Sequence, residues 1–475
     1  MSHKIRSNHK LIWAFALTSL AGFMVTLDNL VVTTALPVIH RDLGASLGGL
    51  EWTVNAYTLT FAVLLLTGAA LGDRFGRRRL LAIGLGIFTA SSALAALAPS
   101  ILALDAARAL QGVGGAIVMP LTLTILAASV PAERRGLALG AWGGITGLAV
   151  AFGPLVGGAV VSGISWQWIF WLNVPIGLVL IPLVWFRLDE SRGDSSRLDL
   201  PGLVLAGVGL LGIVWGLVRG NSLGWGSPEI LGAIVAGVAF IAAFVWWELR
   251  TPTPMLPMRF FRDRAFALAN TASLFFSFGM FGSIFLLAQF FQTVQGYSPL
   301  DSGLRILPWT AMPMIVAPIA GALSDRIGGH RLMGAGLLLQ GIGLAWIAAV
   351  STPSTPYLDI VAPFALSGIG MALFFAPVTN VVLSRVRFEE QGKASGANNT
   401  IRELGGVLGV AVLASIFAHY GGYRTPSTFV DGMNAAVYFG AGVVVLGGVA
   451  AFLIKPLRSR GRRQVDLVPE LEVSA

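Results

Sequence analysis

Long runs of apolar residues recur along the whole chain, separated by short polar stretches. Each run is close to the roughly 20 residues that an α-helix needs to cross about 30 Å of hydrocarbon. Several runs contain glycine or proline, which membrane helices tolerate. The pattern predicts an all-α polytopic membrane protein with fourteen spans, near residues 11–36, 50–71, 80–98, 102–128, 136–161, 167–186, 200–218, 229–248, 266–292, 302–323, 332–350, 358–384, 394–419 and 434–454.

The composition excludes several other classes of protein. Hydrophobic residues make up 55% of the 475 residues and charged residues only 12%, about half the ~25% of a soluble protein. A soluble enzyme and a disordered chain are therefore excluded. The 59 glycines suit helices that pack closely in lipid. The absence of cysteine excludes a disulfide scaffold, thiolate-bound zinc, an iron–sulfur cluster and a thiol nucleophile.

The loop charges predict the orientation of these spans. Most of the 32 lysines and arginines fall in alternate loops, on the same side as both termini. Basic loops stay in the cytoplasm, so both termini are predicted to be cytoplasmic and the number of spans even. The net charge of +9 then needs no nucleic acid partner. The exceptions are Arg41, Arg219, Arg305 and Arg424 on the other side, and Arg108 and Arg402 inside spans.

An internal repeat divides the chain into halves. The segment 69–76 recurs as 321–328, and 110–114 recurs as 366–370, at offsets of 252 and 256 residues. Residues 135–141 match 391–397 at the second offset. Parallel copies of this kind build one large class of transporters, with the substrate site between the halves.

The repeat predicts four parts with different roles. Two six-helix bundles flank a pair of inserted spans, which we expect at the periphery without cavity-lining charge. The predicted parts are a first bundle at 1–187, inserted helices and linkers at 188–264, a second bundle at 265–455 and a cytoplasmic tail at 456–475.

Five motifs resemble those of the major facilitator superfamily, over essentially the whole chain. The loop 72–79 resembles its signature cytoplasmic loop, and Arg108 with Gln111, Gly112 and Gly114 resembles the fourth-span motif of its proton-coupled exporters. The chain is similar to the fourteen-helix drug–proton antiporter branch in three more places, at 147–158, 27–37 and 166–175. Asp105 departs from the pattern, because a neutral residue is expected there.

The resemblance implies a gating role for the loop after the second span. Asp73, Arg74, Gly76 and Arg77 lie where one helix ends and the next begins, and glycine permits a tight turn there. The arrangement recurs as Asp325, Arg326 and Gly328. A basic anchor for the cytoplasmic side is the alternative, although an anchor would need only arginine or lysine.

The fifth span carries small residues at intervals of three or four, which keeps one helical face bare. Its antiporter-like members are Gly147, Gly153, Pro154, Gly157 and Gly158. A bare face lets another backbone approach closely, and Pro154 permits a bend. We expect a contact that seals and reopens during transport, with static helix packing as the alternative.

Asp28 is the strongest candidate for proton coupling. It lies deep in the first span, where an isolated charge costs at least ~2.5–3.5 kcal/mol and usually marks a relay or ligand site. Arg108 of the fourth span is expected at a similar depth, with Asp105 one helical turn away. The two acids and the arginine could therefore meet, and a carboxylate balanced between them can load a proton from outside and release it when a cationic substrate displaces it. The alternative is a permanent Asp28–Arg108 pair that only locks two helices.

Polar and aromatic residues within the spans predict a large, mostly apolar substrate cavity. Its candidate residues are Asn29, Asn55, Tyr57, Gln111, Phe276, Phe285, Gln289, Gln292 and Asn380.

No cofactor, metal site or nucleotide site is expected. The glycine pattern at 207–212 lies inside a span without the strand that a dinucleotide site requires, and no phosphate-binding Gly–Lys loop occurs. The sequence thus predicts a plasma-membrane exporter of amphipathic, cationic small molecules driven by proton antiport, with substrate, H⁺ and the lipid bilayer as partners. A dedicated exporter of one metabolite or lipid-like molecule, a nutrient symporter and a membrane enzyme are the alternatives. Substrate identity, H⁺ against Na⁺ and oligomeric state stay open.

Overall fold

The computed structural model describes residues 2–131, 135–193, 198–387 and 390–455. These residues form helices and connecting loops, and no strand occurs among them. The predicted tail lies outside this range. The helices are α1 (Ser2–Leu43), α2 (Leu47–Phe75), α3 (Arg77–Ala96), α4 (Ile101–Ser129), α5 (Arg135–Gly163), α6 (Trp168–Trp171), α7 (Asn173–Arg187), α8 (Leu200–Leu223), α9 (Pro228–Glu248), α10 (Arg264–Gln289), α11 (Pro299–Thr310), α12 (Met312–Ile327), α13 (Gly329–Val350), α14 (Tyr357–Leu383), α15 (Gln391–Tyr420) and α16 (Pro426–Phe452).

Fourteen helical segments of the described chain are long and apolar enough to cross a membrane, which confirms the predicted number of spans. Two of them are interrupted. The sixth consists of α6 and α7, and the tenth of α11 and α12, where Pro313 enters the first turn after the break. Proline has no N–H to donate, so the backbone hydrogen bond that would continue α11 through this point is missing.

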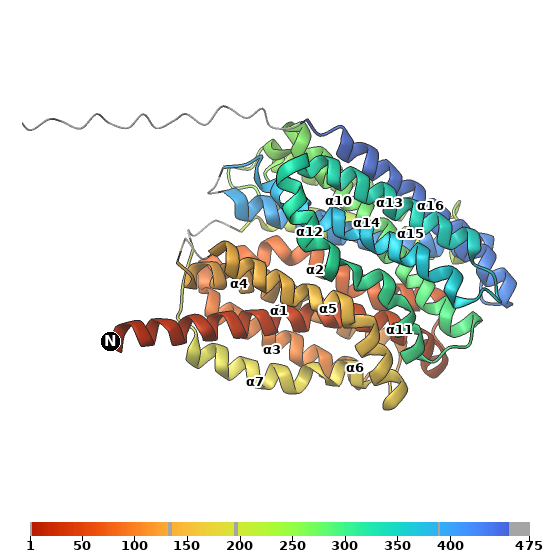
Figure 1. Ribbon diagram of the computed structural model, residues 1–475, viewed down its shortest axis with the longest axis horizontal. Helices are drawn as coiled ribbons and strands as arrows, with labels where there is room; N and C mark the ends of the chain where they lie inside the picture. The colour runs from red at the N-terminus through yellow and green to blue at the C-terminus, as the bar shows by residue number, and fades with distance from the viewer. Residues whose placement is uncertain (1, 132–134, 194–197, 388–389, 456–475) are drawn as a thin grey trace, which may run out of the picture.

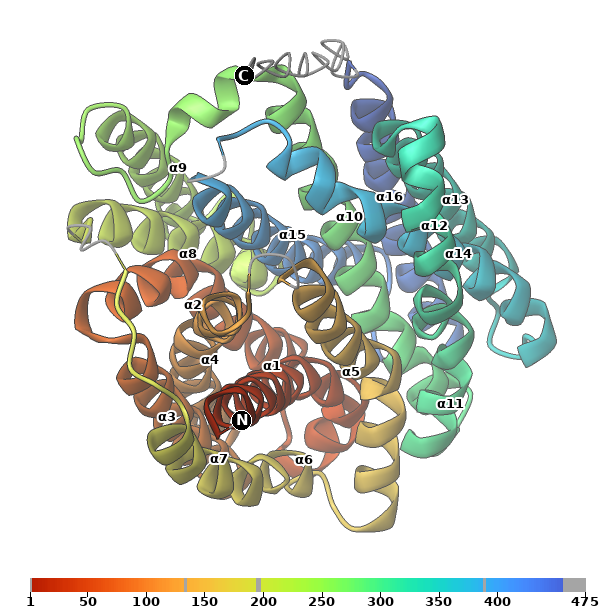
Figure 2. The same cartoon turned by 60° about the vertical axis from the view of Figure 1, so that its left-hand side comes forward.

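The two halves form separate bundles side by side, red to yellow and green to blue in Figure 1. In the first half, α4 packs against α2 and α3, and α1 packs against α5. In the second half, α10 packs against α15 and α16, and α13 against α14 and α16. The α8–α9 hairpin lies at the rim, where α8 contacts α2 and α15 and α9 packs mainly on α8 (Figure 2).

The repeat is visible in the backbone of the two cytoplasmic loops. Gly76 has φ +108° between α2 and α3, and Gly328 has φ +90° between α12 and α13. Residues with a side chain rarely adopt such angles. Glycine at these two positions therefore turns the chain sharply from one span into the next.

Candidate functional site

A buried ion pair joins Asp28 of α1 to Arg108 of α4. Arg108 Nη1 lies 2.5 Å from Asp28 Oδ2, and both side chains are completely shielded from solvent. A buried charge pair is tolerated only when further hydrogen bonds satisfy the remaining atoms. The surroundings of this pair meet that requirement on the carboxylate side.

Two amide side chains complete the coordination of the Asp28 carboxylate. Gln111 Nε2 and Asn173 Nδ2 donate to Asp28 Oδ1 at 2.8 and 2.7 Å. The same two amides donate to Ser92 Oγ at 2.7 and 3.3 Å, and Gln111 Oε1 accepts from Arg108 at 2.7 Å. Helices α1, α3, α4 and α7 thus meet in one polar cluster, which we call the Asp28 network: Asp28, Ser92, Arg108, Gln111 and Asn173.

Aromatic rings and α2 enclose the arginine. The Arg108 guanidinium carbon lies 4.2 Å from the centre of the Tyr57 ring and 5.7 Å from that of Phe170. Cations are attracted to ring faces at such distances. Arg108 Nε also donates to the Thr53 carbonyl oxygen at 3.2 Å. The arginine is therefore fixed by α2 as well as by Asp28.

Asp105 lies next to the Asp28 network and outside it. Its Oδ1 accepts a hydrogen bond of 2.8 Å from the Thr53 hydroxyl, and its side chain is half-buried. Arg108 binds the carbonyl oxygen of the same threonine. Thr53 consequently connects Asp105 to the arginine, while Asp28 holds the direct ion pair.

Ser92 and Asn173 were not among the candidate residues from the sequence. Asn173 lies in the 166–175 motif, between Leu172 and Pro175, and its place in that motif is the sequence feature that could have identified it. Ser92 is one of several serines and threonines in the third span, and no spacing distinguishes it. Only the packing of α3 on α4 and α7 reveals its role.

The first gating loop is tied to the segment that follows α7. Arg77 forms an ion pair with Asp73 at 2.8 Å, and its N–H donates to the Ser191 carbonyl at 2.9 Å. The Glu190 carboxylate accepts the N–H groups of Arg78 and Arg79 at 3.0 and 3.3 Å. Glu190 thereby caps the N-terminus of α3, where a negative charge is favourable.

The remaining gating-loop residues are placed as follows. Arg74 is exposed, with its guanidinium carbon 5.3 Å from the centre of the Phe75 ring. In the second copy, Arg326 is exposed and Gly328 makes the turn. The side chain of Asp325 lies outside the described part of the structure.

The small residues of α5 are covered at one end and bare at the other. A methyl group at Gly153 or Gly157 would lie 2.7 Å from Leu30 Cβ or 2.4 Å from Thr34 Oγ1 of α1. Pro154 contacts α11, since a methyl group at Gly303 would lie 2.3 Å from its carbonyl oxygen. Added methyl groups at four glycines toward the cytoplasmic end would meet nothing within 4 Å: Gly140, Gly143, Gly144 and Gly147; the same holds for Gly163, the last residue of α5.

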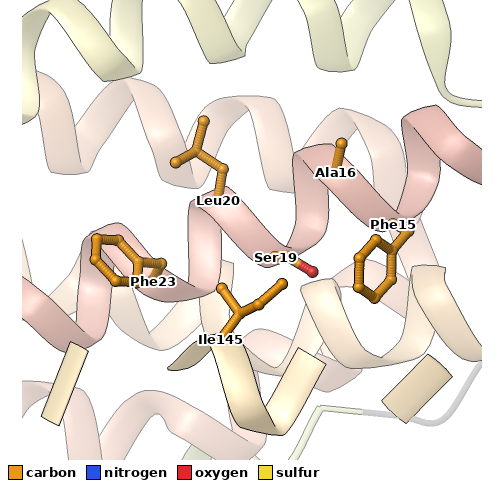
Figure 3. Close-up of a pocket in the computed structure, with 6 residues that line it drawn as sticks. All are labelled: Phe15, Ala16, Ser19, Leu20, Phe23 and Ile145. Carbon is orange, nitrogen blue, oxygen red and sulfur yellow. The ribbon is translucent and has the colours of Figure 1, made fainter. Parts of the chain in front are cut away.

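A pocket of about 370 Å³ lies between α1 and α5, beside the part of α5 whose small residues are bare. Figure 3 shows its lining: Phe15, Ala16, Ser19, Leu20, Phe23 and Ile145. The Ser19 hydroxyl is its polar group and has no hydrogen-bond partner in the described chain. The pocket is apolar and lies on the cytoplasmic side of Asp28, and its lining includes none of the cavity candidates.

The cavity candidates are distributed over several places. Tyr57 and Gln111 belong to the surroundings of Arg108, and Phe276 stacks on Phe374 at 4.6 Å. Gln289 accepts a hydrogen bond from Tyr423, and Gln292 donates to the Thr34 carbonyl across the two halves at 2.8 Å. The others differ in exposure, with Asn55 and Phe285 buried, Asn29 half-buried and Asn380 exposed.

The chain matches a family model over most of its length. The model described as Major Facilitator Superfamily matches residues 18–410, and a second match covers 313–472. Among curated proteins, the chain is 36% identical to the multidrug resistance protein Stp of Mycobacterium tuberculosis over 403 residues, 84% of this chain and 75% of that protein. It is 32% identical to the tetracenomycin C resistance and export protein of Streptomyces glaucescens, covering 88% and 78%. The methylenomycin A resistance protein of Bacillus subtilis is 32% identical, covering 92% and 91%.

Solved transporter structures share the fold. A bacterial homologue of the human lysosomal transporter Spinster, inward-facing and unoccupied, superposes with a TM-score of 0.67 at 16% identity, covering 94% of this chain and 97% of that one. An auto-inhibited POT family peptide transporter gives the same TM-score at 17% identity, covering 94% and 96%.

Proposed function

Because this chain belongs to the major facilitator superfamily, we propose that it exports amphipathic, cationic drugs or toxic small molecules in exchange for protons. The protein is a multi-pass transporter of the plasma membrane and no enzyme. Drug efflux is supported by the relatives, whose names refer to multidrug, tetracenomycin C and methylenomycin A resistance. Coupling to protons and the positive charge of the substrate are our own inferences.

The Asp28 network is the observation that carries the proposal. Its carboxylate is buried, yet one arginine and two amides donate to it. These donors stabilise the charged form, whereas burial favours the neutral form. Opposed influences of this kind let a modest rearrangement of α1, α3, α4 or α7 change the proton affinity. We infer that the carboxyl takes up a proton from outside and releases it toward the cytoplasm.

The contacts of the halves support alternating access. In the outer part of α1, the Thr34 carbonyl accepts a hydrogen bond of 2.8 Å from Gln292, and near the middle of α5 the Ala151 carbonyl accepts one of 2.9 Å from Thr310 Oγ1. Toward the cytoplasm, methyl groups added at Gly140, Gly143, Gly144 and Gly147 of α5 would meet no atom of another element within 4 Å. We infer that this is the conformation closed to the outside, and that the bare end becomes covered when the protein opens outward.

The gating loop is proposed to change partners during this exchange. In this conformation Asp73 binds Arg77, and the Asp73 carbonyl accepts the Gly193 N–H from the linker directly after the first half. We expect Asp73 and Arg74 to contact the second half when the cytoplasmic side closes, because the helix ends must then approach.

Transport by purified protein in proteoliposomes tests the proposal. A pH gradient should drive uptake of a lipophilic cation against its concentration in the wild type. Asp28→Asn should abolish this accumulation while leaving substrate exchange without a gradient measurable. Asp359→Asn is the matched control, since Asp359 is an exposed acid at the start of α14.

Three outcomes would contradict parts of the proposal. Normal pH-driven accumulation by Asp28→Asn would exclude Asp28 as the coupling residue. Loss of folded Asp28→Asn protein would instead favour a structural lock between α1 and α4. Transport of a single neutral metabolite, with no response to a panel of lipophilic cations, would favour a dedicated exporter.

A further inference from the structure

Glu51 of α2 is a buried acid that the Asp28 network does not use. Glu51 is 3% exposed, and its Oε2 atom has no hydrogen-bond partner in the described part of the chain. Asn55 follows one turn later on the same helical face. Asn55 is completely buried, and neither of its amide atoms has a partner in the described chain. Two consecutive turns of α2 therefore bury polar atoms without compensation.

These residues lie on the side of α2 that meets the second half. Toward the cytoplasmic end of this side of α2, Leu66 contacts Gly396 of α15. Leu59, between the two regions, packs with Val407 and Ala411 of α15. Because α2 and α15 run antiparallel, Glu51 lies level with the end of α15 and the loop that follows it. That loop carries Tyr423.

Tyr423 bridges the two halves near Glu51. Its ring stacks on His40 of α1, with ring centres 5.5 Å apart, and its hydroxyl donates to Gln289 of α10. Phe417 and Phe429 pack on the same ring at 5.3 and 5.5 Å. Burial, and then the nearby carboxylate of Glu51, raise the pKa of Tyr423 well above its usual range. We call Glu51, His40, Gln289 and Tyr423 the outer seal.

No basic side chain of the surrounding elements is paired with Glu51 in the described structure. The charged and titratable groups on the elements around it have other neighbours. On α1, Asp28 pairs with Arg108 of α4, Asp42 accepts a hydrogen bond from Trp166, and His40 stacks on Tyr423. On α4, Asp105 accepts a hydrogen bond from Thr53, and on α8 Arg219 lies over the Trp215 ring. On α15, Arg402 pairs with Glu403, and His419 packs on Tyr420. Arg41 and Arg424, near the same ends, form no ion pair with Glu51 in the described part of the chain either.

We propose that Glu51 is a second proton-binding site, and that proton uptake by its carboxyl closes the outer seal. A charged carboxylate without a partner is strongly disfavoured in such a buried position, whereas a neutral carboxyl is tolerated. When Glu51 is charged, opening of the seal returns it to water. A proton from the outside thus favours the closed seal, and loss of the proton favours the open one. This inference rests on the proton-driven exchange proposed above, and it adds a pH-dependent gate on the outer side of the protein.

Distance measurements between two spin labels test this gate. The chain has no cysteine, so Leu102→Cys and Leu358→Cys provide unique labelling sites. These residues are 77% and 81% exposed at the outer ends of α4 and α14, one in each half. Without substrate or gradient, the wild-type distance distribution should shift toward longer, open distances as the pH rises from about 5 to 9. Glu51→Gln should keep the short, closed distances throughout, and Glu51→Asp should retain the shift.

Two comparisons separate this proposal from proton coupling at Asp28. Asp28→Asn should still open with rising pH, because its carboxyl is not part of the seal. A pH response that is lost in Asp28→Asn and unchanged in Glu51→Gln would overturn the proposal. Glu51→Leu also removes the ionisable group and should stay closed, so the test stands if Glu51→Gln is not recovered. If the wild type showed the Glu51 response but no proton-driven accumulation, only the coupling mechanism would be contradicted.

Discussion

Gly158 of α5 lies directly against the backbone of Pro299 in α11. A methyl group added at Gly158 would be 2.3 Å from the Pro299 carbonyl oxygen. The Leu300 N–H donates to the Ser162 hydroxyl one turn further along α5, at 2.9 Å. The outer ends of the two halves thus meet backbone to backbone, and a side chain at Gly158 would hold them apart.

We therefore expect Gly158→Ala to favour the outward-open conformation. Overpacking of this kind typically costs about 1–3 kcal/mol, which corresponds to a roughly 5- to 150-fold change in the ratio of closed to open protein. The spin-label distance between positions 102 and 358 measures that ratio. Gly86→Ala in α3 serves as the control, because a methyl group at Gly86 meets nothing within 4 Å. Equal distance distributions for the two variants would contradict the sealing role of Gly158.

Asn173→Leu should move the pH dependence of transport toward alkaline values. Asn173 donates to the Asp28 carboxylate at 2.7 Å, and a hydrogen bond to a charged group contributes about 1.5–3 kcal/mol. Without this donor the charged carboxylate is less well stabilised, which favours the neutral carboxyl. Initial rates over a pH series measure the shift. Asn434→Leu, which removes an amide bound to the Ser351 carbonyl in the second half, should leave the profile in place.

Glu190→Ala should destabilise the protein more than Asp189→Ala does. Glu190 caps two N–H groups of α3, and loss of a cap costs about 0.5–2 kcal/mol. Asp189 forms an exposed pair with Lys10, at 72% and 63% side-chain exposure, and such pairs contribute little. Thermal unfolding of both variants in detergent provides the comparison. Equal midpoints would show that Glu190 is dispensable as a cap.

Asp73→Asn should change the balance of conformations while leaving insertion intact. The substitution removes the charge that pairs with Arg77 and the charge proposed to meet the second half. Labelling of single cysteines placed on the cytoplasmic and outer sides reports both openings. Unchanged labelling on both sides would exclude the gating role of this loop.

The sequence was sufficient to predict the fold, because the relevant information is local. The length of each apolar run follows from the thickness of the bilayer, and the side of each loop follows from its charge. The helices extend beyond the apolar runs, as α1 does to Leu43, because helices continue past the hydrocarbon until a loop begins. Gly76 and Gly328 were identifiable as turns from the repeat alone.

The site was predictable only in part. Asp28 and Arg108 were identifiable because charges within spans are rare, whereas Ser92 and Asn173 are ordinary polar residues whose importance comes from tertiary contacts. Glu51 lies near a helix end, where an acid usually faces water, and its burial near Tyr423 comes from tertiary packing that the sequence does not contain. Glu190 caps a helix more than a hundred residues earlier in the chain, a relationship that no local pattern contains.

The cap from Glu190 also constrains the order in which the protein can be assembled. A ribosome makes Arg78 long before Glu190, so the N-terminus of α3 stays without its carboxylate until all six spans of the first half have been synthesised. Once residues 190–193 emerge, they bind the loop at Asp73 and Arg77. The first half can therefore complete its cytoplasmic surface before the second half has been synthesised, and membrane insertion can proceed one bundle at a time.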